Sequence, residues 1–281
     1  MKNSITITLL LFAFCLKAQT IQSPSKELAL DFKLAEKGRP SYSLTYKNKP
    51  VVLKSLLGVY LKGDTDLASN FKIDSVRTIT FNETWKPILG EQSSIVNHYN
   101  ELTFCLSQIG TNRKMNIIFK VYDEGIAFRY EFPKQSNLNY FIVSDEKSEF
   151  NLAGNHKAFW IPGDFDSQEY AYSETLLSDV NTEKIDLNNG IGLKSIAGKH
   201  VVQSPLMMKT TDNLYLNIFE AAVVNYPIMH LDLNPTTSAL TSRLVPNAIG
   251  DKAYLQAPCV SPWRTVMVSD DAREIVGSKM I

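Results

Sequence analysis

The chain has 281 residues, of which 29 are lysine or arginine and 29 are aspartate or glutamate, so its formal net charge is zero. A chain with balanced charges carries no basic field that would attract nucleic acid or anionic lipid, and we expect neither partner. No Pro- or Ser-rich linker divides the sequence. This uniform composition predicts one folded domain.

Residues 1–18 have the pattern of a secretory signal peptide. An early lysine precedes an apolar run over 5–16, and the small residue Ala18 suits cleavage before Gln19. The apolar run is shorter than the roughly 20 residues that a helix needs to cross a bilayer, so we expect no membrane span. The sequence therefore predicts an exported, periplasmic protein whose mature domain covers 19–281.

Hydrophobic and polar residues alternate from Leu28 onward, which is the period of a β-strand. The segment 54–74 is less regular, and Asp123-Glu124-Gly125 is a turn between two alternating arms. Helical periodicity is nearly absent, so the sequence predicts an all-β fold, a large and mostly antiparallel β-sandwich. The irregular stretch 178–203 is expected to cross a sheet edge. The expected strands are 28–34, 42–46, 51–53, the two arms within 115–132, 139–143, 158–161, 214–219, 229–233, 240–245 and 264–268.

Acids, aromatics and a turn are concentrated between Trp160 and Thr175. Pro162-Gly163 ends a hydrophobic strand, which predicts a loop where the side chains of Asp164, Asp166 and Glu169 can converge on a ligand. Calcium takes six to eight oxygen ligands, so these acids offer only part of a shell. Taken alone, the pattern is more typical of a solvated acidic loop without a ligand, and both interpretations stay open.

Other candidate groups give weaker signals. The four histidines are not paired at zinc-ligand spacing, and no nucleotide-binding motif is present. Glu169 and Glu174 are candidates for paired glycosidase carboxylates by proximity alone. The polar run 97–101 is expected to satisfy a turn before a strand, with sugar contact as the alternative.

Tryptophans and cysteines each leave two interpretations. Trp85, Trp160 and Trp263 have ring faces that match the apolar face of a sugar, although core packing is the favoured role in a large sandwich. Cys105 and Cys259 remain after signal removal, and an oxidising compartment would allow them to pair. The sequence does not imply that they do.

Several ordered blocks together resemble the N-terminal domain of glycoside hydrolase family 97, a family of exported α-glucosidases and α-galactosidases. The stretch 178–203 has no convincing match. The matching blocks are N-E-T-W-K-P at 82–87, N-H-Y-N-E-L at 97–102, D-E-G-I-A-F-R-Y-E-F-P at 123–133, F-W-I-P-G-D-F-D-S-Q-E-Y at 159–170, L-M-M-K-T at 206–210 and S-P-W-R-T at 261–265.

The resemblance implies one part of a larger enzyme. In that family the sandwich packs on a catalytic (β/α)₈ barrel and supplies one glutamate to an active-site calcium ion, and the matching residue here is Glu169. The resemblance places the remaining ligands and the catalytic groups on the barrel, which this sequence lacks, so we expect no catalytic residue and no activity in this chain alone. The expected substrate is an α-linked oligosaccharide or glycoside.

The ending at Ile281 is explained most simply by an incomplete gene or fragment. Two other functions remain open. The first is a free-standing carbohydrate-binding module that grips a glycan with the loop 160–172. The second is a docking domain with affinity for neither sugar nor calcium.

Overall fold

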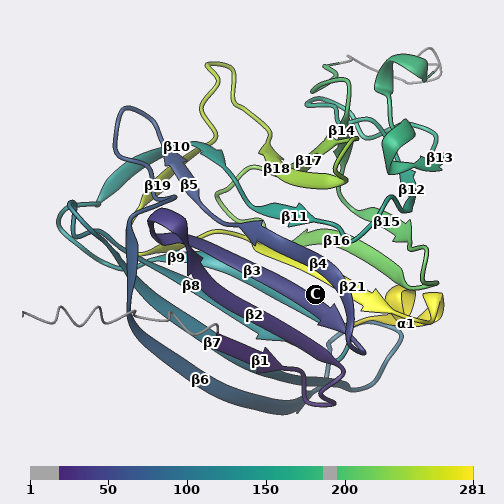
Figure 1. Ribbon diagram of the computed structural model, residues 1–281, viewed down its shortest axis with the longest axis horizontal. Helices are drawn as coiled ribbons and strands as arrows, with labels where there is room; N and C mark the ends of the chain where they lie inside the picture. Colours follow the sequence, from purple (N-terminus) through teal and green to yellow (C-terminus); the bar gives the residue numbers. More distant parts are fainter. Residues whose placement is uncertain (1–18, 186–194, 281) are drawn as a thin grey trace, which may run out of the picture.

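The computed structural model describes residues 19–185 and 195–280 of the chain. Antiparallel strands dominate these residues, and the predicted all-β sandwich is confirmed (Figure 1). The signal peptide expected at 1–18 lies outside the described residues.

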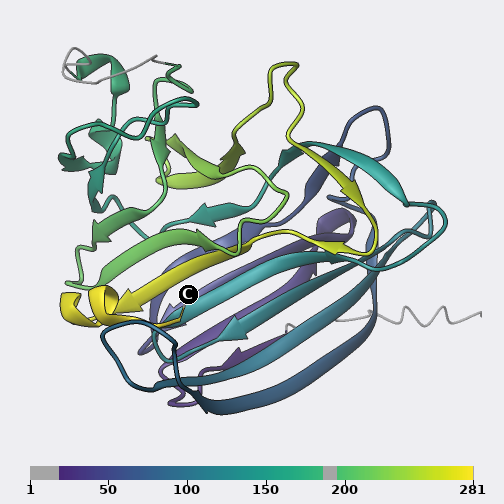
Figure 2. The ribbon, with the colours of Figure 1, turned by 180° about the vertical axis from the view of Figure 1, so that it is seen from behind.

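The largest layer is a ten-stranded sheet that curves along the length of the molecule (Figures 1 and 2). Strands far apart in the sequence become neighbours in it, because the last long strand pairs with strands from the middle of the chain. In spatial order the sheet contains β13 (Ser173–Leu176), β12 (Lys157–Trp160), β15 (Leu206–Lys209), β16 (Tyr215–Ala221), β21 (Trp263–Ser269), β9 (Gly125–Phe132), β8 (Lys114–Val121), β7 (Ile95–Gln108) and β6 (Phe71–Trp85), with β20 (Cys259–Val260) beside β9.

A second, four-stranded sheet packs on this layer and closes the sandwich. Its alternating residues face the large sheet, as the sequence pattern predicts. The ring of Phe32 stacks on Phe104 with 3.8 Å between centroids, and Tyr42 lies 5.4 Å from Phe128. These aromatic contacts form the centre of the core. The sheet consists of β1 (Gln19–Gln22), β2 (Leu28–Ala35), β3 (Arg39–Tyr46) and β4 (Lys49–Leu56).

Two smaller sheets extend the sandwich beyond this core. Within the described residues the helical elements are short, and none has the length and hydropathy needed to span a membrane. The smaller sheets are β19 (Ala253–Gln256), β10 (Tyr140–Glu146) and β5 (Val59–Leu61), and β11 (Glu149–Asn151), β18 (Ala239–Leu244), β17 (Met229–Asn234) and β14 (Val201–Gln203); the helical turns are η1 (Glu36–Gly38), η2 (Leu177–Asp179), η3 (Thr182–Lys184) and α1 (Ala272–Gly277).

One prominent feature differs from the sequence prediction. Strands β6 and β7 form a long ribbon at the edge of the large sheet, and the polar run 97–101 lies inside β7 instead of in a turn before a strand. Strand β6 has solvent on much of its surface, so its sequence carries little of the hydrophobic signal that marks a buried strand. Trp85 at its end is 46% exposed, against the expected core role.

A buried ion cluster joins the large sheet to the three-stranded sheet that contains β10. Arg264 on β21 is fully buried and donates from Nε and Nη2 to the two carboxylate oxygens of Glu146 on β10, each at 2.9 Å. Its Nη1 donates to Glu220, the residue opposite it on β16. The cluster therefore connects three strands of two sheets through a single side chain.

The carboxylates of this cluster have further partners. Glu146 accepts hydrogen bonds from Ser148 at 2.8 Å and Tyr226 at 2.9 Å. Burial opposes the ionised form of Glu146, but Arg264 and these donors outweigh it and hold the pKa of Glu146 below its usual value. At Glu220 burial is the stronger effect, and the pKa of its carboxyl is raised.

Substitution of Arg264 by methionine should destabilise the fold strongly. The change leaves Glu146 and Glu220 buried without a cation, a situation that lowers the free energy of unfolding by about 3–5 kcal/mol. Urea unfolding followed by tryptophan fluorescence measures this loss. Arg273→Met is the matched control, because the Arg273 side chain is 90% exposed and its pair with Asp271 lies at the surface, and it should change stability by less than about 1 kcal/mol. Equal effects of the two substitutions would contradict the role given to Arg264.

Candidate functional site

The loop between β12 and β13 starts from a fixed point. Strand β12 ends at Trp160, whose buried indole donates from Nε1 to the Thr175 hydroxyl at 3.0 Å. Gly163 follows and donates its amide to the carbonyl of Val201 at 2.7 Å. A Cβ at this glycine would lie 2.5 Å from Cγ1 of Val201, so only glycine lets the backbone approach so closely. Trp160 has the core role that the sequence favours.

Asp164 organises the next part of the loop. Its side chain is 2% exposed and accepts hydrogen bonds from the amides of Asp166 at 2.8 Å, Ser167 at 3.1 Å and Ser195 at 3.1 Å, and from the Tyr170 hydroxyl at 2.5 Å. Burial opposes its ionisation, yet these donors hold the pKa of Asp164 below its usual value. Burial and this hydrogen bond raise the pKa of Tyr170 to about 12.

Two buried side chains form hydrogen bonds with the backbone of the same segment. Gln203 donates from Nε2 to the carbonyls of Pro162 at 3.0 Å and Ser167 at 2.8 Å. His230 has Nε2 at 2.8 Å from the carbonyl of Asp164, and its ring stacks on Phe165. Because a carbonyl can only accept, Nε2 carries the proton; burial lowers the pKa of His230, which favours the neutral ring.

The carboxylates of the loop do not converge, contrary to the expectation from their spacing. Asp164 points inward, and Asp166 accepts the hydroxyl of Ser195. Glu169 is exposed, its amide donates to Ser167 Oγ at 3.2 Å, and its carboxylate has no hydrogen bond or ion pair within the described part of the chain. Glu174 on β13 pairs with Lys157 at 2.5 Å, so the partner of its carboxylate among the described residues is a lysine.

The described residues do not assemble a metal shell around Glu169. Among residues 19–185 and 195–280 no group of three histidine, cysteine, aspartate or glutamate side chains could hold an ion. Calcium needs six to eight oxygens, and a carboxylate supplies at most two. Glu169 could contribute to a metal site only as one ligand among several, because its carboxylate is exposed and has no partner among the residues that the structure describes.

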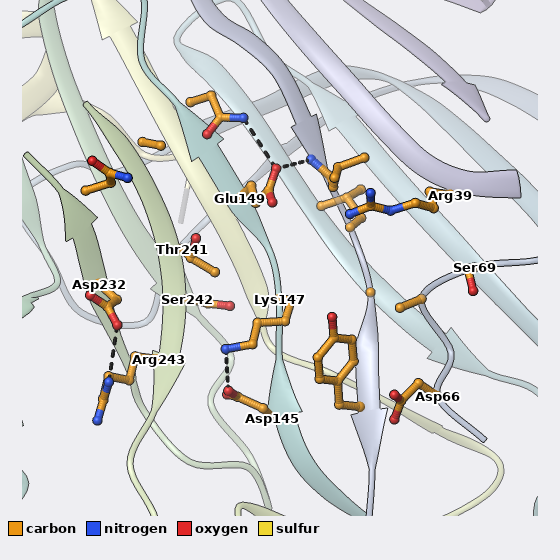
Figure 3. Close-up of a pocket in the computed structure, with 18 of the residues that line it drawn as sticks. Arg39, Asp66, Ser69, Asp145, Lys147, Glu149, Asp232, Thr241, Ser242 and Arg243 are labelled. Atoms are coloured by element: carbon orange, nitrogen blue, oxygen red, sulfur yellow. Dashed lines mark hydrogen bonds and ion pairs between the residues drawn. The ribbon is translucent and has the colours of Figure 1, made fainter. Parts of the chain in front are cut away.

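A second candidate feature lies away from this loop and was not predicted. A groove with a volume of about 1040 Å³ opens between β4, β5, β11, β17 and β18 (Figure 3). Charged residues line it, among them Arg39, Glu149 and Arg243. They come from separate strands and lie together only in the fold, so no local sequence pattern marks them.

The remaining sequence candidates lie apart from a recognisable site in the part of the chain that the structure describes. Trp263 is partly buried, and the cationic groups of Lys120 and Arg129 lie 4.9 and 4.3 Å from its ring centroid. Cys105 and Cys259 are unpaired in the structure. Burial raises the pKa of the Cys259 thiol to about 11, so it is not an activated nucleophile.

The Asp164 hydrogen bonds should make the free energy of unfolding depend on pH in the acidic range. Since the folded-state pKa lies below the ordinary value of 3.8, the ionised side chain stabilises the fold above about pH 4, and this contribution disappears as the pH falls through the folded-state pKa. Asp164→Asn should lower the free energy of unfolding at pH 7 by about 2 kcal/mol and weaken its acid dependence. Urea unfolding between pH 7 and pH 3 measures both effects.

Asp179→Asn is the matched control for this prediction, because Asp179 is exposed in η2. It should leave stability at pH 7 and its acid dependence close to those of the unchanged protein. An Asp164→Asn variant that behaves like this control would show that the carboxylate does not hold the loop.

Comparison with solved structures gives the same fold. A glycoside hydrolase family 97 enzyme from Pseudoalteromonas sp. strain K8, solved with acarbose, aligns with a TM-score of 0.82 and 29% identity over 93% of this chain and 37% of its own. A β-arabinopyranosidase aligns with a TM-score of 0.75 at 21% identity over 90% of this chain and 40% of its own, which is a likeness of fold.

The sequence comparisons agree. A retaining α-galactosidase from Bacteroides thetaiotaomicron is 24% identical over 256 residues, which cover 85% of this chain and 35% of that protein. The chain thus spans little more than a third of the length of these relatives. The family profile described as Glycosyl-hydrolase 97 N-terminal matches residues 21–281. The chain belongs to glycoside hydrolase family 97, as its N-terminal domain.

Proposed function

We propose that this chain is the N-terminal domain of a calcium-dependent glycoside hydrolase of the α-glucosidase type, and that Glu169 is its ligand to the active-site calcium ion. The observation that carries the proposal is an exposed carboxylate, without a partner in residues 19–185 and 195–280, on a loop that is otherwise fixed by hydrogen bonds. Family membership supports the hydrolase, and the names of relatives, one an α-galactosidase and one solved with acarbose, support an α-linked substrate.

In this reaction the residues of this chain would bind the calcium ion and orient its ligand, and would not carry out bond cleavage. Asp164 holds the backbone of the loop just before Glu169 and also binds the amide of Ser195, so that Glu169 would meet the ion on a segment that is already ordered. A bound calcium ion would supply a fixed positive charge near the scissile bond. The loop would also form part of the pocket rim beside a (β/α)₈ barrel.

The acid, base or nucleophile of hydrolysis would belong to that barrel. Glycoside hydrolysis needs two carboxylates placed on either side of the bond. Glu169 and Glu174 do not provide them, because Glu174 is paired with Lys157. We therefore propose that the chain is inactive alone, that it is a fragment of a longer protein, and that it works in the periplasm on α-linked oligosaccharides or glycosides.

Glu169→Ala should weaken calcium binding in a protein that joins residues 19–281 to a family 97 catalytic barrel. Loss of a direct ligand should lower calcium affinity by at least tenfold, on the order of 1.4 kcal/mol or more. Calorimetric titration of the metal-free protein measures the affinity, and hydrolysis of an aryl α-glucoside and an aryl α-galactoside measures activity. Both should fall together, and added calcium should restore part of the activity.

Glu174→Ala is the matched control, since its carboxylate forms an exposed pair with Lys157. It should bind calcium as the unchanged protein does. Equal calcium affinity in the Glu169→Ala and unchanged proteins would refute the metal assignment, and hydrolysis by residues 19–281 alone would refute the division of labour.

A further inference from the structure

The groove in Figure 3 lies apart from the β12–β13 loop and has the size of a ligand site. Its volume of about 1040 Å³ is slightly above the range of roughly 300–1,000 Å³ that is usual for small-molecule pockets. Asp232, Thr241 and Arg243 come from one wall, and Arg39 and Asp66 come from the other (Figure 3).

The charges of the groove are nearly balanced. Two pairs neutralise one another, because Lys147 contacts Asp145 at 2.6 Å and Arg243 contacts Asp232 at 3.2 Å. A cation or an anion in the groove would be repelled by the lining charges of its own sign. An apolar ligand would bury charged groups without partners. The groove is therefore suited to a neutral, polar ligand. Its lining includes the cations Lys37, Arg39, Lys147, Arg243 and Lys252 and the carboxylates Asp66, Asp145, Glu149 and Asp232.

Glu149 supplies a fixed acceptor on the floor of the groove. Its Oε2 accepts hydrogen bonds from the amide of Leu56 at 2.8 Å and from Nδ2 of Asn151 at 3.3 Å, as the dashed lines of Figure 3 mark. Its Oε1 has no partner within the described ranges. One oxygen thus orients the carboxylate, and the other is left to accept from a ligand without first losing rotamer freedom.

The other groups in the groove complement this acceptor. Arg39 is exposed and forms no ion pair in the described part of the chain, so its guanidinium is available as a planar donor. Thr241 offers a hydroxyl that can donate or accept. Tyr60, which is 36% exposed, adds an aromatic ring to the lining. Acceptors, donors and one aromatic face together match the hydroxyls and the apolar face of a sugar ring.

We propose that this groove is a second carbohydrate site, which binds a neutral oligosaccharide through Glu149, Arg39 and Thr241. The choice of α-linked sugars rests on the proposed function; the choice of a neutral polyhydroxylated ligand rests on the groove itself. Such a site would hold a longer glycan to the domain while its end is cleaved elsewhere in the enzyme.

Residues 19–281 should bind maltotriose or raffinose with a dissociation constant on the order of 1 mM, a value usual for shallow sites with few contacts. Titration followed by NMR, in EDTA so that calcium plays no part, measures it. Glu149→Gln keeps the side-chain size but replaces a charged acceptor by a weaker neutral one, and should reduce affinity by about tenfold. Arg39→Ala should reduce it similarly.

Glu174→Gln, on the distant strand β13, is the control and should bind as the unchanged chain does. Urea midpoints of all variants confirm that they are folded. Absence of saturable binding to either sugar would overturn the proposal. So would an affinity of the Glu149→Gln and Arg39→Ala variants equal to that of the unchanged chain. Binding that is lost in Glu169→Ala but kept in Glu149→Gln would also overturn it, because the sugar would then lie at the β12–β13 loop.

This test can fail independently of the calcium assignment. It measures sugar binding by the chain alone without metal, whereas the Glu169→Ala experiment measures calcium binding in a protein that contains a barrel. Tighter binding of a sulfated or uronic oligosaccharide than of maltotriose would contradict the balance of charges on which the choice of a neutral ligand depends.

Discussion

The pairing of Arg264 with Glu146 and Glu220 is the constraint on which the arrangement of the sheets depends. Burying three ionised groups is unfavourable unless each is paired and hydrogen-bonded. Here the guanidinium donates hydrogen bonds to two carboxylates from different strands. Hydrophobic contacts tolerate small sliding movements, whereas this geometry is satisfied at one register of β16 on β21 and one position of β10. We infer that the cluster fixes the mutual position of the large sheet and the three-stranded sheet of β10 more than it adds to stability.

Two sets of interactions fix the β12–β13 loop relative to the Arg264 cluster. Strand β12 is connected to the Arg264 strand through β15 and β16, and the loop after β12 is then fixed locally by Asp164, Gln203 and His230. The carboxylate of Asp164 is used entirely inside the protein, while that of Glu169 is left free. An acidic loop thus contains one residue that shapes the backbone and one that is exposed. Under the proposed function, this division would lower the entropy lost when Glu169 binds a metal.

Alternating hydrophobic residues predict strands correctly where one face of the strand is buried. Alternation located the hairpin of β8 and β9 and the strands around Leu28 and Trp160, because one face of each is buried. It missed β6, an edge strand with little buried surface, and misjudged Trp85 for the same reason. The part played by Asp164 was beyond local reasoning, since Ser195 and His230 lie 31 and 66 positions away in the chain. The groove residues are equally scattered along the sequence.

A calcium ion shared between Glu169 and ligands outside this domain would do more than provide charge. Its binding free energy is available only when both sets of ligands are in place, so the metal would stabilise their association by mass action and would be held weakly by either part alone. Metal binding is unfavourable in entropy when it must first order the segment that carries a ligand. In this domain the Asp164 hydrogen bonds already order the loop that carries Glu169. Within the proposed function, the exposed position of Glu169 is therefore a requirement: a carboxylate satisfied by its own domain would have nothing left to link two domains through one ion.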